Sequence, residues 1–146
     1  AGIVYDSMWG STGIMASAIA SGLEDEGVPV RIIDIQKNHH SDVMTELADC
    51  GAVIVGSATH NNNVLPGIAD VLTYMKGLRP LNRVGAAFGS YGWSGESPKI
   101  IQEWLASMNM DMPADPVKCL FVPKHEGLSQ CVALGKTVAE ALKAKC

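Results

Sequence analysis

The sequence predicts an α/β fold in which helices cover both faces of a doubly wound, five-stranded parallel sheet. Short apolar runs alternate with amphipathic segments five times along the chain, which is the pattern of βα units. Polar, glycine-rich segments follow the first, third and fourth apolar runs, as expected where parallel strands end at one edge. Because crossovers between parallel strands are right-handed, these units give the strand order 2-1-3-4-5.

The first two βα units are predicted within residues 1–49. A strand over 3–5 opens the chain, and a helix follows that ends at Gly27, a residue type common at helix C-termini. The apolar residues of this helix recur at helical spacing and are Ile14, Met15, Ala18, Ile19, Gly22 and Leu23. A second strand is predicted over 28–35 and a short second helix over 41–49.

The remaining three units fill the rest of the chain. Residues 52–55 form a continuous apolar run, typical of a strand buried on both faces, and Pro66 suits the first turn of the next helix. Strands are further predicted over 84–88 and 117–122. The apolar faces of the last three helices are Ile68, Val71, Leu72, Met75 and Leu78, then Ile100, Ile101, Trp104, Leu105 and Met108, then Cys131, Leu134, Val138 and Leu142.

Composition predicts one globular domain over residues 1–146. The hydrophobic content of 47% excludes a disordered chain, and a net charge of −4 argues against nucleic-acid binding, which needs clustered Lys and Arg. No apolar run is long enough for a membrane span, and no charged-then-apolar leader opens the chain, so we expect a cytoplasmic location. The four cysteines form no C-x-x-C pair and are expected as free thiols.

The turn after the first strand has the composition of a phosphate-binding loop. Ser7, Ser11 and Thr12 offer hydroxyls, while Gly10 and Gly13 let the backbone curl so that N–H groups point inward at the positive helix end. No Lys or Arg lies in the turn, which favours a tightly held cofactor monophosphate over a triphosphate. An ordinary strand-to-helix turn capped by Ser or Thr is the alternative.

Several motifs together carry a resemblance to a known family. They are Tyr5-Asp6-Ser7-Met8-Trp9, Gly56-Ser57-Ala58-Thr59-His60-Asn61-Asn62, Leu65-Pro66, Lys76-Gly77-Leu78-Arg79-Pro80 and Phe88-Gly89-Ser90-Tyr91-Gly92-Trp93-Ser94-Gly95-Glu96. The chain thereby resembles, over nearly its whole length, the flavodoxin domain of flavodiiron proteins, especially the rubredoxin:oxygen oxidoreductases. The resemblance implies a flavodoxin-like fold and FMN-dependent electron transport from a rubredoxin-type donor to a diiron domain that reduces oxygen or nitric oxide. It also implies a head-to-tail homodimer of the full-length protein.

The resemblance assigns the cofactor contacts to three segments. Those for the FMN phosphate are Ser7, Met8, Trp9, Gly10, Ser11 and Thr12, and those for the isoalloxazine ring are Ser57, Ala58, Thr59, His60, Asn61, Asn62, Ser90, Tyr91, Gly92, Trp93, Ser94 and Gly95. A flavin site needs a movable carbonyl and backbone donors near the ring. Asn61, Asn62 and Gly92 tolerate the positive φ that such close backbone approach requires.

The chain offers no ligand set for iron. Its four histidines lie outside any H-x-E-x-D-H arrangement, so we expect no metal site, no catalytic residue and no reduction of oxygen or nitric oxide without a diiron domain, in cis or in trans. A free-standing flavodoxin and an NAD(P)H:quinone reductase stay open as alternatives. A receiver domain is not expected, because this chain has no phosphoryl-acceptor Asp at the end of the third strand. The Rossmann and P-loop motifs are also absent from the sequence.

Overall fold

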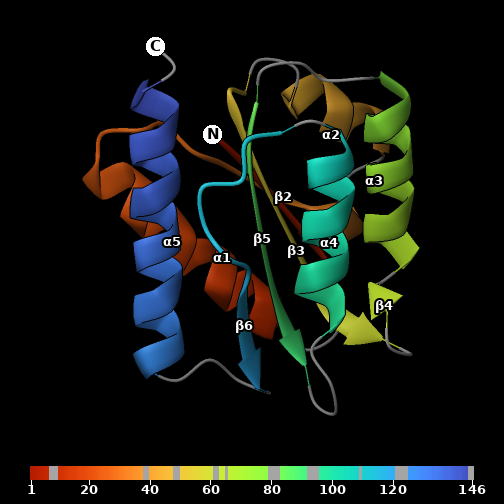
Figure 1. The fold of residues 1–146 in the computed structure, drawn as a ribbon. Helices are drawn as coiled ribbons and strands as arrows, with labels where there is room; N and C mark the ends of the chain where they lie inside the picture. The colour runs from red at the N-terminus through yellow and green to blue at the C-terminus, as the bar shows by residue number, and fades with distance from the viewer. Residues whose placement is uncertain are drawn as a thin grey trace.

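The computed structural model has a parallel sheet with helices on both faces (Figure 1). The residues it describes are 1–6, 10–37, 40–47, 50–60, 63–64, 66–78, 83–91, 96–108, 110–120 and 125–144. The parallel strands are β1 (Gly2–Asp6), β2 (Arg31–Asp34), β3 (Ala52–His60), β5 (Val84–Tyr91) and β6 (Val117–Leu120). Their order, β2-β1-β3-β5-β6, confirms the predicted order 2-1-3-4-5.

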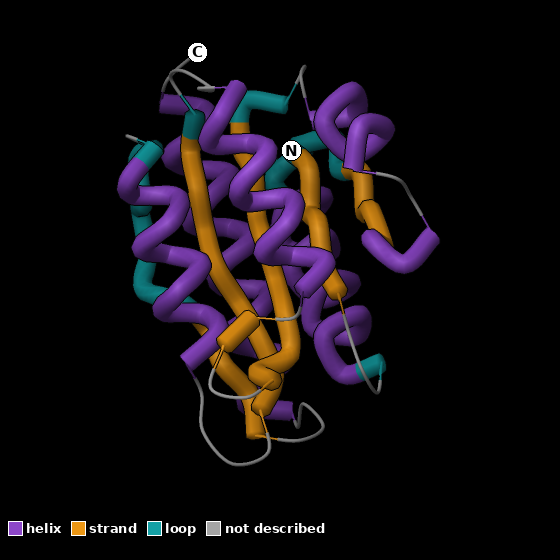
Figure 2. The backbone as a smooth tube through the Cα atoms, turned by 90° about the vertical axis from the view of Figure 1, so that its right-hand side faces the viewer, coloured by secondary structure: helices purple, strands orange, loops and turns teal. Residues whose placement is uncertain are grey.

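The helices divide into two layers, one on each side of the strands (Figure 2). One layer is α1 (Ser11–Asp25) with α5 (His125–Ala144), and the other is α2 (His40–Leu47), α3 (Pro66–Leu78) and α4 (Glu96–Ser107). A short 3-10 turn, η1 (Ile35–Lys37), follows β2. Pro66 is the first residue of α3, as predicted, because its missing N–H has no partner to lose there.

Each helix layer covers its own apolar cluster. Strand side chains alternate between the two clusters: Ile3 and Ile54 lie with α1 and α5, whereas Val4 and Val53 lie with α2, α3 and α4. All four side chains are buried, as a strand covered on both faces requires. The continuous apolar runs in the sequence therefore predicted the central strands correctly.

Glycines bring α1 and α5 into close contact. A Cβ added at Gly22 would overlap the carbonyl oxygen of Val132, and one added at Gly135 would overlap that of Ile19. The two helix backbones therefore approach one another at a distance that only glycine permits. This contact fixes the position of α1, whose first turn lies at the candidate site.

Several details differ from the sequence prediction. The second strand begins at Arg31 rather than at residue 28, because Pro29 has no N–H to donate to a ladder. The third and fourth strands run past their predicted ends at residues 55 and 88, to His60 and Tyr91. The antiparallel β4 (Asn63–Val64) beside β3 was not predicted, and Ile14, assigned to the apolar helix face, is 46% exposed.

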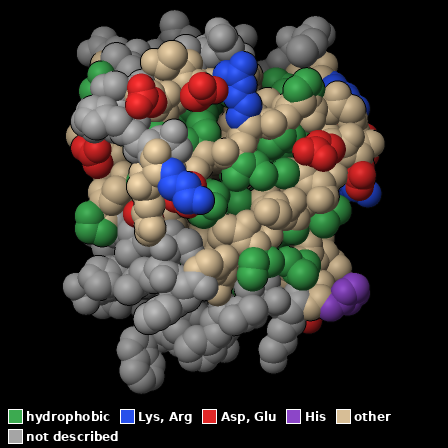
Figure 3. Space-filling view, turned by 180° about the vertical axis from the view of Figure 1, so that it is seen from behind, with side chains coloured by type: hydrophobic (Ala, Val, Ile, Leu, Met, Phe, Trp, Pro, Cys, Tyr) green, Lys and Arg blue, Asp and Glu red, His purple; other side chains and the backbone are tan. Residues whose placement is uncertain are grey.

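The distribution of charged side chains and the character of the helices can be compared with what the composition predicted. On the face seen in Figure 3, acidic and basic side chains are interspersed around apolar ones rather than gathered into one cationic stripe. Among the residues that the structure describes, no helix has the length and apolar character needed to cross a bilayer.

Candidate functional site

The turn before α1 is built to receive an anion. Gly10 is the N-cap of α1 with a left-handed φ of 84°, and the N–H of Ile14 donates to its carbonyl at 3.1 Å. The cap residue carries no side-chain acceptor, and the first turn contains no acidic residue. This geometry differs from the Ser- or Thr-capped alternative and leaves the positive end of the helix for a ligand's negative charge, so the turn fits a phosphate.

The two glycines of this turn have different roles. Gly10 supplies the positive φ that was predicted for the curled loop. Gly13 does not, because it lies within α1, where a Cβ added to it would lie only 3.3 Å from Cε2 of the Tyr5 ring. Burial raises the pKa of Tyr5, as do the nearby charge of Asp34 and a hydrogen bond to it. The prediction that Gly13 helps to curl the loop was therefore wrong.

A buried hydroxyl pair joins the phosphate turn to the end of β5. The hydroxyl oxygens of Thr12 and Ser90 lie 3.0 Å apart in a hydrogen bond between residues 78 positions apart in the sequence. Thr12 is fully buried and Ser90 is 6% exposed. Since each hydroxyl can donate one proton and also accept, this bond leaves one of the two protons available to another acceptor.

A second buried hydroxyl joins β3 to α4. The hydroxyl of Ser97, in the first turn of α4, donates to the carbonyl of Ser57 at 3.0 Å, and Ser57 donates its own hydroxyl to the carbonyl of Ala58 at 2.8 Å. Gly89 on β5 permits this approach, because a Cβ there would overlap the Ser57 carbonyl. These contacts tie the ends of β3 and β5 to the beginning of α4.

The strand register brings to one edge the described strand ends next to the three predicted segments. Asp6 on β1 pairs with Ser57 on β3, which pairs in turn with Gly89 on β5, and Ala58 pairs with Ser90. The arrowheads of β3, β5 and β6 accordingly lie at the same end of the sheet (Figure 1). The convergence that the sequence predicted for the first, third and fourth strand ends is confirmed at this level.

One buried acidic residue at this edge was given no role of its own by the sequence analysis. Asp6, at the end of β1, is 7% exposed, and its carboxylate accepts a hydrogen bond of 2.8 Å from the Nε2 amide of Gln36. It also lies against Gly67 in the first turn of α3, where the positive helix end stabilises a carboxylate. The only signal in the sequence was an acidic residue directly after an apolar run.

Many predicted cofactor contacts fall outside the described residues or are described only in part. Those outside are Ser7, Met8, Trp9, Asn61, Asn62, Gly92, Trp93, Ser94 and Gly95. Thr59, His60 and Tyr91 are described only as strand residues, in β3 and β5. The described site residues Gly10, Ser11, Thr12, Ser57, Ala58 and Ser90 are those that the strand ends bring together.

The described cysteines are buried in the core, and Cys119 on β6 pairs with Ser90 on β5. The three that the structure describes, Cys50, Cys119 and Cys131, are buried free thiols. Burial raises the pKa of Cys131 to about 12, with contributions from the adjacent Cys119 thiol. Among the described residues, no group of His, Cys, Asp or Glu is placed to hold a metal ion.

Comparison with known proteins decides the family. The family model described as Flavodoxin matches residues 3–135. The chain belongs to the flavodoxin family. Rubredoxin-oxygen oxidoreductase of Megalodesulfovibrio gigas is 54% identical over 143 residues, which are 98% of this chain and 36% of that protein.

Solved structures agree with this flavodoxin assignment. Rubredoxin oxygen:oxidoreductase from Desulfovibrio gigas has a TM-score of 0.96 at 53% identity, covering 99% of this chain and 36% of the other. The flavodiiron protein from Giardia intestinalis has a TM-score of 0.92 at 29% identity, with coverages of 99% and 36%. The chain thus spans about a third of the length of these relatives and is the flavodoxin-like module of a flavodiiron protein. Its cofactor is FMN, through which it transfers electrons.

Proposed function

We propose that this chain takes electrons from a rubredoxin-type donor and passes them to a diiron domain, in cis or in trans, that reduces oxygen or nitric oxide. The observation that carries the proposal is the match to rubredoxin-oxygen oxidoreductase, because the chain aligns over 98% of its own length with only 36% of that protein. The remaining length of that relative leaves room for a second domain. We further propose that residues 1–146 form one domain, that the full-length protein is a cytoplasmic homodimer, and that the rim of His60, Asn61 and Trp93 is an interface in that dimer.

The described residues supply the phosphate end of the cofactor site. Backbone N–H groups of Ser11 and Thr12, following the left-handed Gly10, would hold the FMN phosphate at the positive end of α1. Bound FMN supplies a centre that takes up and releases one or two electrons. We propose that the twelve ring-contact residues named from the sequence hold the isoalloxazine, with Ser57 and Ser90 acting through the strand ends that they brace.

The proposal is tested by reconstituting the purified chain with FMN and following the flavin absorbance in an anaerobic stopped-flow instrument. We expect one FMN per chain, rapid reduction by reduced rubredoxin, and slow reoxidation by oxygen compared with a complete flavodiiron enzyme. Addition of an iron-bearing domain from a relative should accelerate the reoxidation.

Two outcomes would favour other functions, and a third would contradict the proposal. Direct and rapid reduction by NADPH would favour an NAD(P)H:quinone reductase. A free-standing carrier would be favoured if the chain exchanged electrons efficiently with rubredoxin but no iron-bearing domain accelerated its reoxidation. Rapid turnover of oxygen to water by the chain alone would contradict the proposal, because one FMN stores fewer electrons than that reaction consumes.

A further inference from the structure

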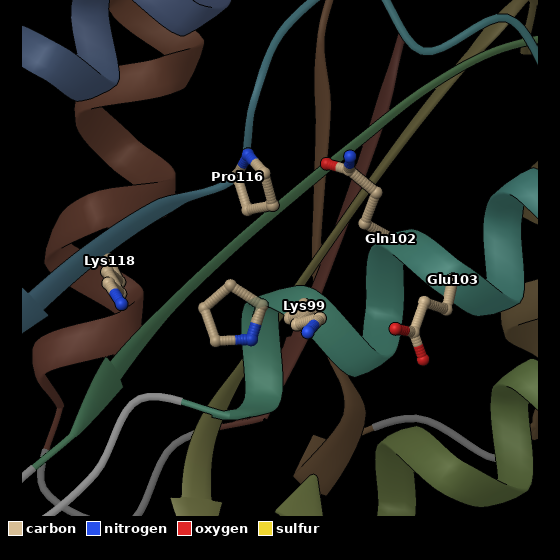
Figure 4. Close-up of a pocket in the computed structure, with 6 residues that line it drawn as sticks. Lys99, Gln102, Glu103, Pro116 and Lys118 are labelled. Carbon is tan, nitrogen blue, oxygen red and sulfur yellow. The ribbon is translucent and has the colours of Figure 1, made fainter.

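Helix α4 and the edge strand β6 leave a groove of about 380 Å³ between them (Figure 4). The groove exists because α4 packs mainly on β3 and β5 and leaves one face of β6 uncovered. Along β6, Val117 and Cys119 belong to the cluster beneath α1 and α5. Lys118, which lies between them, therefore faces the opposite side and lines the groove.

The groove combines positive charge with apolar walls. Lys99 and Lys118 are exposed and approach it from opposite walls, although the chain as a whole has a net charge of −4. Pro98 and Pro116 supply apolar surface. The acidic residue among those that line the groove is Glu103, which lies one helical turn beyond Lys99 in α4. The positively charged end of the groove is therefore the end nearer the start of α4.

The groove also holds an unmet hydrogen-bond acceptor. The side-chain oxygen Oε1 of Gln102 is buried and has no hydrogen-bond partner in the structure. Figure 4 shows this side chain extending from α4 toward Pro116. A buried carbonyl without a donor destabilises the free chain, so a ligand that offers an N–H would remove the cost.

The groove lies close to Ser90, which is in the described part of the predicted flavin-ring segment. Lys118 pairs with Gly89, which precedes Ser90 at the end of β5. Lys99 lies one helical turn from Glu96, the first residue of α4, which follows the ring segment in the chain. A protein bound in this groove would thus stand at the same edge of the sheet as the cofactor.

We propose that this groove is the docking surface for an acidic electron-donor protein. Carboxylates of the donor pair with Lys99 and Lys118, and one of its N–H groups donates to Gln102 Oε1. Each reduced donor loses one electron, and two such donors supply the two electrons that, with two protons from solvent, convert one FMN to FMNH₂. This inference rests on the proposed function, since it assigns the place at which the donor of that function binds.

The charge part of the proposal is tested with the FMN-loaded chain and a reduced rubredoxin whose acidic residues outnumber its basic ones. The double variant Lys99→Gln/Lys118→Gln removes the basic pair, and Lys136→Gln/Lys143→Gln removes the same charge from α5, on the other face of the sheet. At low ionic strength we expect the groove variant to slow bimolecular flavin reduction about tenfold and to flatten its salt dependence. We expect the control to change the rate less than twofold.

A second variant separates docking from charge in general. Gln102→Leu removes the unpaired carbonyl, so the free chain should melt at a higher temperature while its dissociation constant for oxidised rubredoxin rises about fivefold. The affinity for FMN should stay unchanged. A gain in stability without any loss of rubredoxin binding would overturn the role of Gln102.

Other outcomes overturn the docking site or the proposed function separately. Equal effects of the two double variants, or no effect of either, would show that the groove does not bind the donor. Self-association of the wild-type chain that the groove variant abolishes would identify a second copy as the occupant. A wild-type chain that rubredoxin does not reduce at all would instead contradict the proposed function, before any variant is compared.

Discussion

Replacement of Ser90 by alanine should weaken the binding of FMN more than that of riboflavin. Ser90 lies at the end of β5, but its hydroxyl is hydrogen bonded to that of Thr12 in the first turn of α1. Ser90→Ala leaves the fully buried Thr12 hydroxyl without this partner, which shifts the turn whose N–H groups face the phosphate. Riboflavin has no phosphate, so its affinity does not depend on that turn.

The size of the effect follows from the strength of one hydrogen bond to a charged group. Such a bond contributes about 1.5–3 kcal/mol, and every 1.4 kcal/mol changes a dissociation constant tenfold. Misalignment of one phosphate contact should therefore raise the dissociation constant for FMN about tenfold or more. We expect a smaller change, of less than about threefold, for riboflavin, since the backbone of Ser90 and the other eleven proposed ring contacts remain.

The measurement is a titration of the apoprotein with each flavin, in which the quenching of flavin fluorescence reports binding. Ser97→Ala is the matched control, because it also removes a buried hydroxyl, one that donates to Ser57 on β3 rather than to the phosphate turn. Ser97→Ala should weaken the binding of both flavins by the same factor. Ser90→Thr, which keeps a hydroxyl at this position, should restore the selectivity for FMN. Equal losses of FMN and riboflavin in Ser90→Ala would refute the reasoning and place the phosphate elsewhere.

Two further predictions concern stability. Gly22→Ala forces a Cβ against the carbonyl of Val132 and should cost about 2–4 kcal/mol of unfolding free energy by chemical denaturation, whereas an effect below 0.5 kcal/mol would contradict the close helix contact. The pKa of Cys131 rises from 9.0 to about 12 on folding, so the native state keeps a proton that the unfolded chain releases. The effect of this thiol on the unfolding free energy should be constant below pH 9. Above pH 9 the unfolding free energy should fall by up to about 1.4 kcal/mol per pH unit, and Cys131→Ala should reduce this slope. An unchanged slope in the variant would refute the prediction.

The strand order was predictable because it depends on patterns that lie within short stretches of sequence. Apolar runs and helical periodicity located every parallel strand and its following helix, and handedness then gave the order. The strand ends were less predictable, because Ser57 and Ser90 are polar and were assigned to loops. In the structure their backbones continue the ladder and their hydroxyls are satisfied internally, which makes burial inexpensive.

The candidate site was predictable as a location but not as a set of contacts. Thr12 and Ser90 meet only because β1, β3 and β5 pair in one particular register, and no local pattern encodes that register. Gly13 illustrates a second limit. A glycine that makes a turn and one that admits a neighbouring ring are identical in the sequence, and only the position of Tyr5 distinguishes them.

The absence of Lys and Arg from the phosphate turn makes the placement of α1 decisive for cofactor binding. A long cationic side chain can follow a displaced phosphate, whereas backbone N–H groups point where the helix axis directs them. The axis of α1 is set by its contact with α5, where Gly22 and Gly135 allow the two backbones to touch. Gly22→Ala should therefore lower FMN affinity in the folded fraction as well as stability, although Gly22 lies three turns from the phosphate end of the helix.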